Sequence, residues 1–176
     1  MNCKQCGAPM NVEESQNFFH CGYCGCYDFP NPNLDGVALL DEISPYPCPI
    51  CNKPLVSAIV NNVRLFSCPR CRGNLIEQSK MLPIIRQSKS LDTINEDLQY
   101  PPEKSEFTRT VTCPSCHKMM AVYPYGGPGN IIIQGCEQCR LIWLDFGELS
   151  RIIRSYLQMY NQSTDEPGAK KKWVAF

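Results

Sequence analysis

Cys113-Pro114-Ser115-Cys116 and Cys136-Glu137-Gln138-Cys139 are the stretches of this 176-residue chain that decide its fold. Each stretch places two cysteines three positions apart, and 19 residues separate the two stretches. Structural zinc is commonly held by four thiolates in a tetrahedron, supplied by two such C-x-x-C loops about 15–20 residues apart. The two stretches therefore predict one four-cysteine zinc site.

The same arrangement recurs along the chain. Twelve of the thirteen cysteines form six C-x-x-C pairs, and 14, 23, 16, 41 and 19 residues separate successive pairs. Since short separations alternate with long ones, we expect the pairs to join as first with second, third with fourth and fifth with sixth. This grouping predicts three structural zinc ions, with the ligand sets Cys3, Cys6, Cys21 and Cys24; Cys48, Cys51, Cys68 and Cys71; and Cys113, Cys116, Cys136 and Cys139.

Three other potential ligands stand beside these pairs. Cys26 lies two residues past Cys24 and is expected to be a spare thiol, although it could replace a ligand of the first site. His20 is expected to be a strand residue, and His117 a turn residue that tolerates a left-handed backbone. Imidazole is a zinc ligand too, so His20 stays open as an alternative. Iron in a rubredoxin-like site is the minor alternative to zinc.

Composition argues for small units in place of one large core. The chain has 15 Pro and 11 Gly besides its cysteines, and no run approaches the ~20 apolar residues of a membrane helix. The first residues lack the apolar region of a signal peptide, and an odd cysteine count disfavours a secreted disulfide scaffold. We therefore expect a cytoplasmic protein of a small, metal-stabilised, β-rich fold class, made of three tandem zinc ribbons.

Alternating apolar residues predict a hairpin within each unit, the clearest running over residues 55–60 and 63–67 around Asn61-Asn62. Two more are expected, over 10–12 with 17–20 and over 119–123 with 130–134. Helical spacing predicts a helix after the third ribbon, over about 146–161, whose apolar stripe is core, and a shorter one near 78–88 that carries Pro83. The expected division is a first ribbon over 1–30, a linker over 31–45, a second ribbon with its helix over 46–88, a linker over 89–110, a third ribbon with its helix over 111–162, and a mobile tail over 163–176.

A shift of 68 residues aligns the second unit with the third, placing Leu75-Ile76-Glu77 on Trp143-Leu144-Asp145. The third unit continues Trp143-Leu144-Asp145-Phe146-Gly147-Glu148-Leu149 and resembles the transcription factor IIB-type zinc ribbon of small bacterial proteins, whose pattern is C-P-x-C, a hairpin, then C-x-x-C-G-G-x-W-L-D-x-G-E-L. It departs from that pattern at Arg140-Leu141, and the second unit departs at Leu75-Ile76-Glu77. The resemblance implies zinc at the cysteines of both units and says little about activity.

Charge is unevenly distributed, with a net −5 over residues 1–45 and +6 over residues 46–90. Basic side chains beside an aromatic ring are typical of phosphate and base contacts. A nucleic acid or an acidic partner could therefore bind the second ribbon, although the favoured interpretation is that its cations offset the zinc thiolates and pair with the acidic first unit. The residues that could form this contact are Lys53, Arg64, Phe66, Arg70 and Arg72.

The sequence constrains the function of the protein less than it constrains the fold. Catalytic zinc needs an open coordination position, whereas each predicted site has four thiolates, and the chain has two His and no H-E-x-x-H or phosphate-binding glycine loop. The favoured interpretation is a non-catalytic zinc protein that acts as a protein-interaction module. The alternative is a nucleic-acid-binding protein of transcription or translation. Neither a membrane nor a small-molecule substrate is expected.

Overall fold

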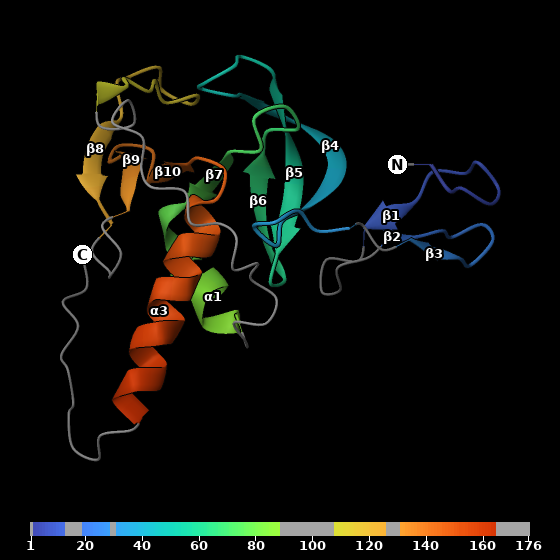
Figure 1. Cartoon of the computed structure of the whole chain (residues 1–176). Coiled ribbons are helices and arrows are strands. Elements are labelled where there is room, and N and C mark those ends of the chain that lie inside the picture. Colours follow the sequence, from blue (N-terminus) through green and yellow to red (C-terminus); the bar gives the residue numbers. More distant parts are fainter. Residues whose placement is uncertain (1, 13–18, 29–30, 89–107, 126–130, 165–176) are drawn as a thin grey trace.

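The protein is described here by a computed structural model that covers residues 2–12, 19–28, 31–88, 108–125 and 131–164 (Figure 1). A three-stranded antiparallel sheet has the order β1-β2-β3, and a seven-stranded antiparallel sheet has the order β4-β5-β6-β7-β10-β9-β8. The expected β-rich fold class, with a helix after the second ribbon and another after the third, is confirmed. The strands are β1 (Asn11–Val12), β2 (Phe19–His20), β3 (Tyr27–Asp28), β4 (Ala38–Pro47), β5 (Pro54–Val60), β6 (Val63–Ser67), β7 (Asn74–Glu77), β8 (Ala121–Pro124), β9 (Ile132–Cys136) and β10 (Leu141–Leu144).

The second and third ribbons share one sheet, which their sequence patterns did not predict. Strand β7 of the second ribbon pairs antiparallel with β10 of the third, and Leu75 lies directly opposite Trp143. These two residues are 68 positions apart, the period of the internal repeat. The second and third ribbons are therefore related by an approximate two-fold axis that passes between Leu75 and Trp143.

The segment 31–45, expected to be a linker, contains most of a strand. Strand β4 pairs with β5 from Ala38 opposite Ile59 to Pro47 opposite Pro54, with register shifts on both sides of Ile43. These irregularities interrupt the two-residue alternation that marks a strand in sequence, because an extra residue changes the face on which the next side chain lies. Buried residues of β4 and β5 also form one apolar cluster with Phe19 of the first ribbon, so the segment joins the two sheets.

The β5–β6 hairpin has the predicted turn. Asn61 and Asn62 both adopt positive φ, at 47° and 60°, and Val60 pairs with Val63. This geometry is the type I′ turn, whose twist matches the flanking strands. The 13–16 turn and the 126–130 segment of the other two predicted hairpins lie outside the described residues, as do most of the 89–110 linker and of the 163–176 tail.

Two helices, α1 (Gln78–Gln87) and α3 (Glu148–Thr164), lie together beside the large sheet (Figure 1). Their buried apolar residues belong to one core with strands β5, β6, β7, β9 and β10, which confirms that the predicted stripe after the third ribbon is core. Helix α1 is the shorter helix, as expected, yet it continues through Pro83, although proline removes an interior hydrogen bond. Burial of Ile84 and Ile85 just past the proline accounts for the continuation.

The N-terminus of α3 is capped from a distant part of the chain. Asp145 and Glu148 are three residues apart, as in a capping box, and Glu148 Oε2 accepts the Asp145 N–H at 2.7 Å. Asp145 itself is engaged elsewhere, by the Trp143 indole at 3.1 Å and by Arg109. Asp35 supplies the side-chain acceptor at the start of the helix.

The Asp35 carboxylate accepts the Gly147 N–H at 2.8 Å, the Ser150 N–H at 3.2 Å and the Ser150 hydroxyl at 2.7 Å. The bond from the Ser150 N–H is one that a side chain at the helix N-cap would accept, and Gly147, which occupies that position, has no side chain with which to accept it. Burial raises the pKa of Asp35, while the bonds from Gly147 and Ser150 oppose that rise. The segment before β4 is thereby fixed to the third ribbon.

We expect Asp35→Ala to lower the free energy of unfolding by about 1–3 kcal/mol, because buried N–H groups at the start of α3 lose their acceptor. Denaturant unfolding followed by circular dichroism at constant zinc measures the change. Glu42→Ala is the control, since Glu42 is half exposed and 3.6 Å from Arg64, and a surface pair contributes about 1 kcal/mol or less. Equal effects of the two variants would contradict the capping role.

We expect Leu149→Ala to lower the free energy of unfolding by about 2–5 kcal/mol, because Leu149 is fully buried between α3 and the sheet. The matched control is Leu82→Ala on α1, where the leucine is 45% exposed and a change within about 0.5 kcal/mol is typical of a surface position. Thermal unfolding of both variants provides the comparison. A stable Leu149→Ala variant would mean that this face of α3 is not part of the core.

Candidate metal centres

Each C-x-x-C pair is presented by a tight backbone turn. In the turns that begin at Cys3, Cys21, Cys48, Cys68 and Cys113, the carbonyl of that cysteine accepts the N–H four residues later at 2.8–2.9 Å. The residue after every one of the six pairs adopts positive φ, between 52° and 75°. His117 is one of these residues, so it is the turn residue that was expected. Arg72 and Arg140 adopt the same conformation despite their side chains.

The second and third centres contain the predicted cysteines. In each, four sulfur atoms lie within 4.8 Å of one another. The Sγ–Sγ distances include 3.5 Å for Cys48–Cys71, 3.4 Å for Cys51–Cys68 and 3.6 Å for Cys116–Cys136. Zinc–sulfur bonds of about 2.3 Å give a tetrahedron with edges of about 3.8 Å. The spacing of the thiols therefore fits a zinc ion.

Burial follows one pattern in these two centres. The first cysteine of each pair is buried, with Cys68 and Cys113 fully so, and the second is intermediate. Backbone N–H groups point at the buried sulfurs, as when Ile50 donates to Cys48 Sγ at 3.4 Å and Cys139 donates to Cys136 Sγ at 3.5 Å. Such donors stabilise the negative charge that four thiolates bring to a zinc ion.

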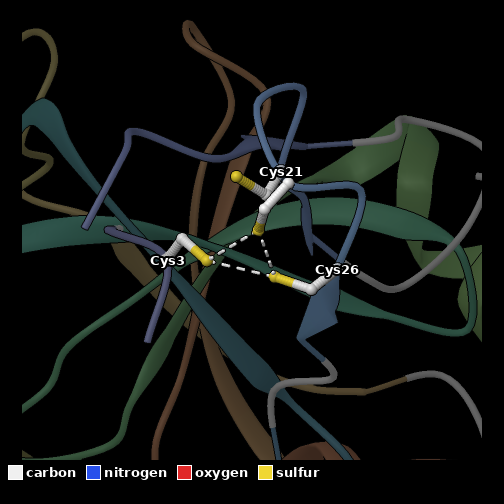
Figure 2. A group of neighbouring side chains, drawn as sticks. Cys3, Cys21 and Cys26 are labelled. Carbon is white, nitrogen blue, oxygen red and sulfur yellow. Dashed lines mark hydrogen bonds between the residues drawn. The ribbon is translucent and has the colours of Figure 1, made fainter. Parts of the chain in front are cut away.

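The first centre contains five thiols. The sulfurs of Cys3, Cys21, Cys24 and Cys26 lie within 4.8 Å of one another, so this group has Cys26 where Cys6 was predicted. Cys6 Sγ is 3.5 Å from Cys21 Sγ. Figure 2 shows the sulfur atoms of Cys3 and Cys26 turned toward each other. Cys26, expected to be spare, thus belongs to the cluster, and the C-x-C that it forms with Cys24 was the available signal. The His20 ring instead contacts Tyr27, with centroids 4.9 Å apart.

The thiols within a centre share their protons unevenly. A hydrogen bond from Cys71 lowers the pKa of Cys48 to about 5, and the same bond raises the pKa of Cys71. In the first centre, a bond from Cys26 lowers the pKa of Cys3 to about 6 and raises that of Cys26. Loss of the last protons from such a cluster requires a cation to balance the charge, and a divalent metal supplies it.

The predicted nucleic-acid contacts of the second ribbon are scattered among different environments. Arg64 lies 3.6 Å from Glu42, and the Arg72 guanidinium stacks over the Phe146 ring at 3.8 Å from its centroid. The Phe66 ring packs edge-on against another aromatic ring and is half buried. Lys53 and Arg70 are exposed. The structure therefore uses two of the four cations in contacts within the molecule.

The comparison with protein families decides the identity of the two larger ribbons. The sequence model of the family described as transcription factor zinc-finger, the TFIIB-type zinc ribbon, matches residues 47–87 and 112–155. The chain contains two tandem zinc ribbons of the TFIIB type. The matched segments begin beside the first ligand of each centre and include the first turns of both helices. The first ribbon lies outside the match.

Searches of curated proteins and of solved structures found no match. Among the described residues, no helix combines the length and the apolar character needed to cross a membrane. The three groups of four cysteines are consistent with three structural zinc ions. In such sites zinc supplies folding energy, because it cross-links two loops that the unfolded chain does not hold together.

We expect native mass spectrometry to find three zinc ions per chain. Removal of the metal with a chelator should abolish the β-sheet signal in circular dichroism, because the thiols of the second and third centres are part of an apolar cluster. Iron in place of zinc, fewer than three ions, or a metal-free chain that keeps its fold would contradict three structural zinc centres.

Proposed function

We propose that this chain is a non-catalytic zinc protein whose ribbons form a rigid scaffold for binding another protein. The reduced cysteines are compatible with the cytoplasm, where thiols persist. In this proposal zinc stabilises the fold, and the surface of the protein binds the partner.

Several features of the centres support a non-catalytic role. Each group offers at least four thiols to one metal, so the set of ligands is complete without water or substrate. The thiols of the second and third centres are half buried or fully buried. A zinc ion coordinated in this way has no open position at which to activate water or polarise a carbonyl.

The outer edge of the large sheet is the observation that best supports a protein partner. All four residues of β8 are exposed, and in the described part of the chain β8 pairs with β9 on one side and with no strand on the other. Nearby apolar side chains are also exposed, Met119 at 71%, Val122 at 40% and Tyr123 at 36%. An edge strand with apolar side chains can pair with an extended segment of another protein.

The basic residues give weaker support to nucleic acid as the partner. Arg64 lies 3.6 Å from Glu42 and the exposed Arg72 stacks over Phe146, so each would give up a contact to bind phosphate. Lys53 and Arg70 are the other two cations of the predicted set, and both are exposed. Nucleic-acid affinity rises with the number of phosphates neutralised, so two cations provide little. We therefore place the binding surface at β8 and not on the second ribbon.

A photo-crosslinking amino acid at Val122 tests this proposal. We expect a discrete protein adduct in cells that express the chain, and a several-fold lower yield when Met119→Glu is added, because the charge disrupts the apolar edge. The matched control is Ile43→Glu, at an apolar position that is 78% exposed on β4, the opposite edge of the sheet.

A second crosslinker at Lys53 compares the alternative directly. Nucleic-acid adducts at Lys53, together with the absence of a discrete protein adduct at Val122, would overturn the proposal. An adduct at Val122 that is equally sensitive to Met119→Glu and to Ile43→Glu would also overturn it, because the contact would then not be specific to β8.

A further inference from the structure

The five thiols of the first ribbon exceed what one zinc ion can bind. We propose that this centre has two interchangeable fourth ligands, Cys6 and Cys26, with Cys3, Cys21 and Cys24 common to both arrangements. Binding of zinc by Cys6 or Cys26 does not depend on the proposed protein partner.

The backbone places Cys6 as a ligand. The Gly7 N–H donates to the Cys3 carbonyl at 2.8 Å, and Gly7 has a φ of 75°. The turns that begin at Cys48, Cys68 and Cys113 have the same bond and also a positive φ at the residue that follows the pair. Cys6 Sγ also lies 3.5 Å from Cys21 Sγ, a spacing close to the edge of a zinc–thiolate tetrahedron, about 3.8 Å.

The sulfur positions support Cys26, which stands in the group of close thiols in place of Cys6. The Cys26 Sγ lies 3.0 Å from Cys3 Sγ and 3.2 Å from Cys24 Sγ, closer than the thiol contacts of the second and third centres. Cys26 belongs to the group whose sulfurs all lie within 4.8 Å. Binding of zinc would widen these two separations by about 0.6–0.8 Å, to the tetrahedral edge of about 3.8 Å.

The backbone around Cys26 explains why a fifth thiol reaches the centre. The Cys21 N–H donates to the Cys26 carbonyl at 2.9 Å, which fixes Cys26 at the base of the same turn. The turns that begin at Cys3, Cys48, Cys68 and Cys113 form the equivalent bond at 2.7–2.9 Å, and none of the accepting residues carries a thiol. These equivalent residues are Ala8, Lys53, Gly73 and Lys118. A thiol at this position is therefore specific to the first ribbon.

The consequence of a fifth thiol is ligand exchange at a bound metal. The entering thiol gives up a proton as it binds zinc, and the thiolate that it displaces takes one up, so no electrons are transferred. Exchange of this kind requires access to the centre. Cys6 and Cys24 are exposed and Cys26 is intermediate, whereas every ligand of the other two centres is buried or intermediate.

Zinc retention in serine variants tests the inference. The probe is zinc itself, counted by native mass spectrometry of the full chain after incubation with a competing chelator. The chelator concentration is set with Cys51→Ser, the matched control, as the lowest at which that variant loses one zinc ion while the unaltered chain keeps three. Cys51 is the second cysteine of its pair, as Cys6 is, and its centre has no fifth thiol.

We expect Cys6→Ser and Cys26→Ser each to keep three zinc ions, and the double variant to keep two. Loss of one ion from Cys6→Ser alone would overturn the inference, since Cys26 would then be unable to replace it. Loss from Cys26→Ser alone would overturn it too, by identifying Cys26 as the fixed ligand and Cys6 as spare. Retention of three ions by the double variant would show that neither thiol is needed, which also overturns it.

Discussion

The antiparallel pairing of β7 with β10 is the contact on which most of the fold depends. A zinc ribbon alone is a sheet of two or three short strands, which buries too little apolar area to be stable without metal. Joined at β7 and β10, the two ribbons form a seven-stranded sheet together with β4, and one face of this sheet becomes large enough to pack against both α1 and α3 (Figure 1). The helices thus share a single core and do not each cover a separate ribbon.

The same pairing places both larger metal centres beside one apolar cluster. Cysteines of the second and third centres belong to this cluster together with Leu55, Leu75 and Trp143. The thiols are consequently part of the interior as well as ligands, and the metal and the core stabilise the same set of strands. The first ribbon is attached differently, through apolar contacts with β4 and β5, and its thiols are more exposed. The first centre, whose thiols are more exposed, is also the centre that contains a fifth thiol.

The features that could be predicted are those determined by nearby residues. Cysteine spacing predicts the metal sites, because each pair needs only one tight turn to present its two thiols. Asn61-Asn62 predicts a hairpin, because asparagine tolerates positive φ. Features that depend on distant residues could not be predicted. Asp35 caps a helix more than one hundred residues away, and β4 has irregular pairing that hides its alternation. Cys26 was noticed, but its distance to the other sulfurs depends on the fold.

The two-fold relation between the larger ribbons also accounts for a departure from the family pattern. Leu75 stands where that pattern has tryptophan, and its direct cross-strand neighbour is Trp143, the equivalent residue of the other ribbon. Both side chains are almost completely inaccessible to solvent, and a single methyl group added at Gly73 would already lie 2.3 Å from the Trp143 ring. Two indoles would have to occupy adjoining positions in a space that holds one. A duplicated motif that pairs with itself must therefore lose its symmetry at the axis, with one copy keeping the large side chain and the other accepting a smaller one.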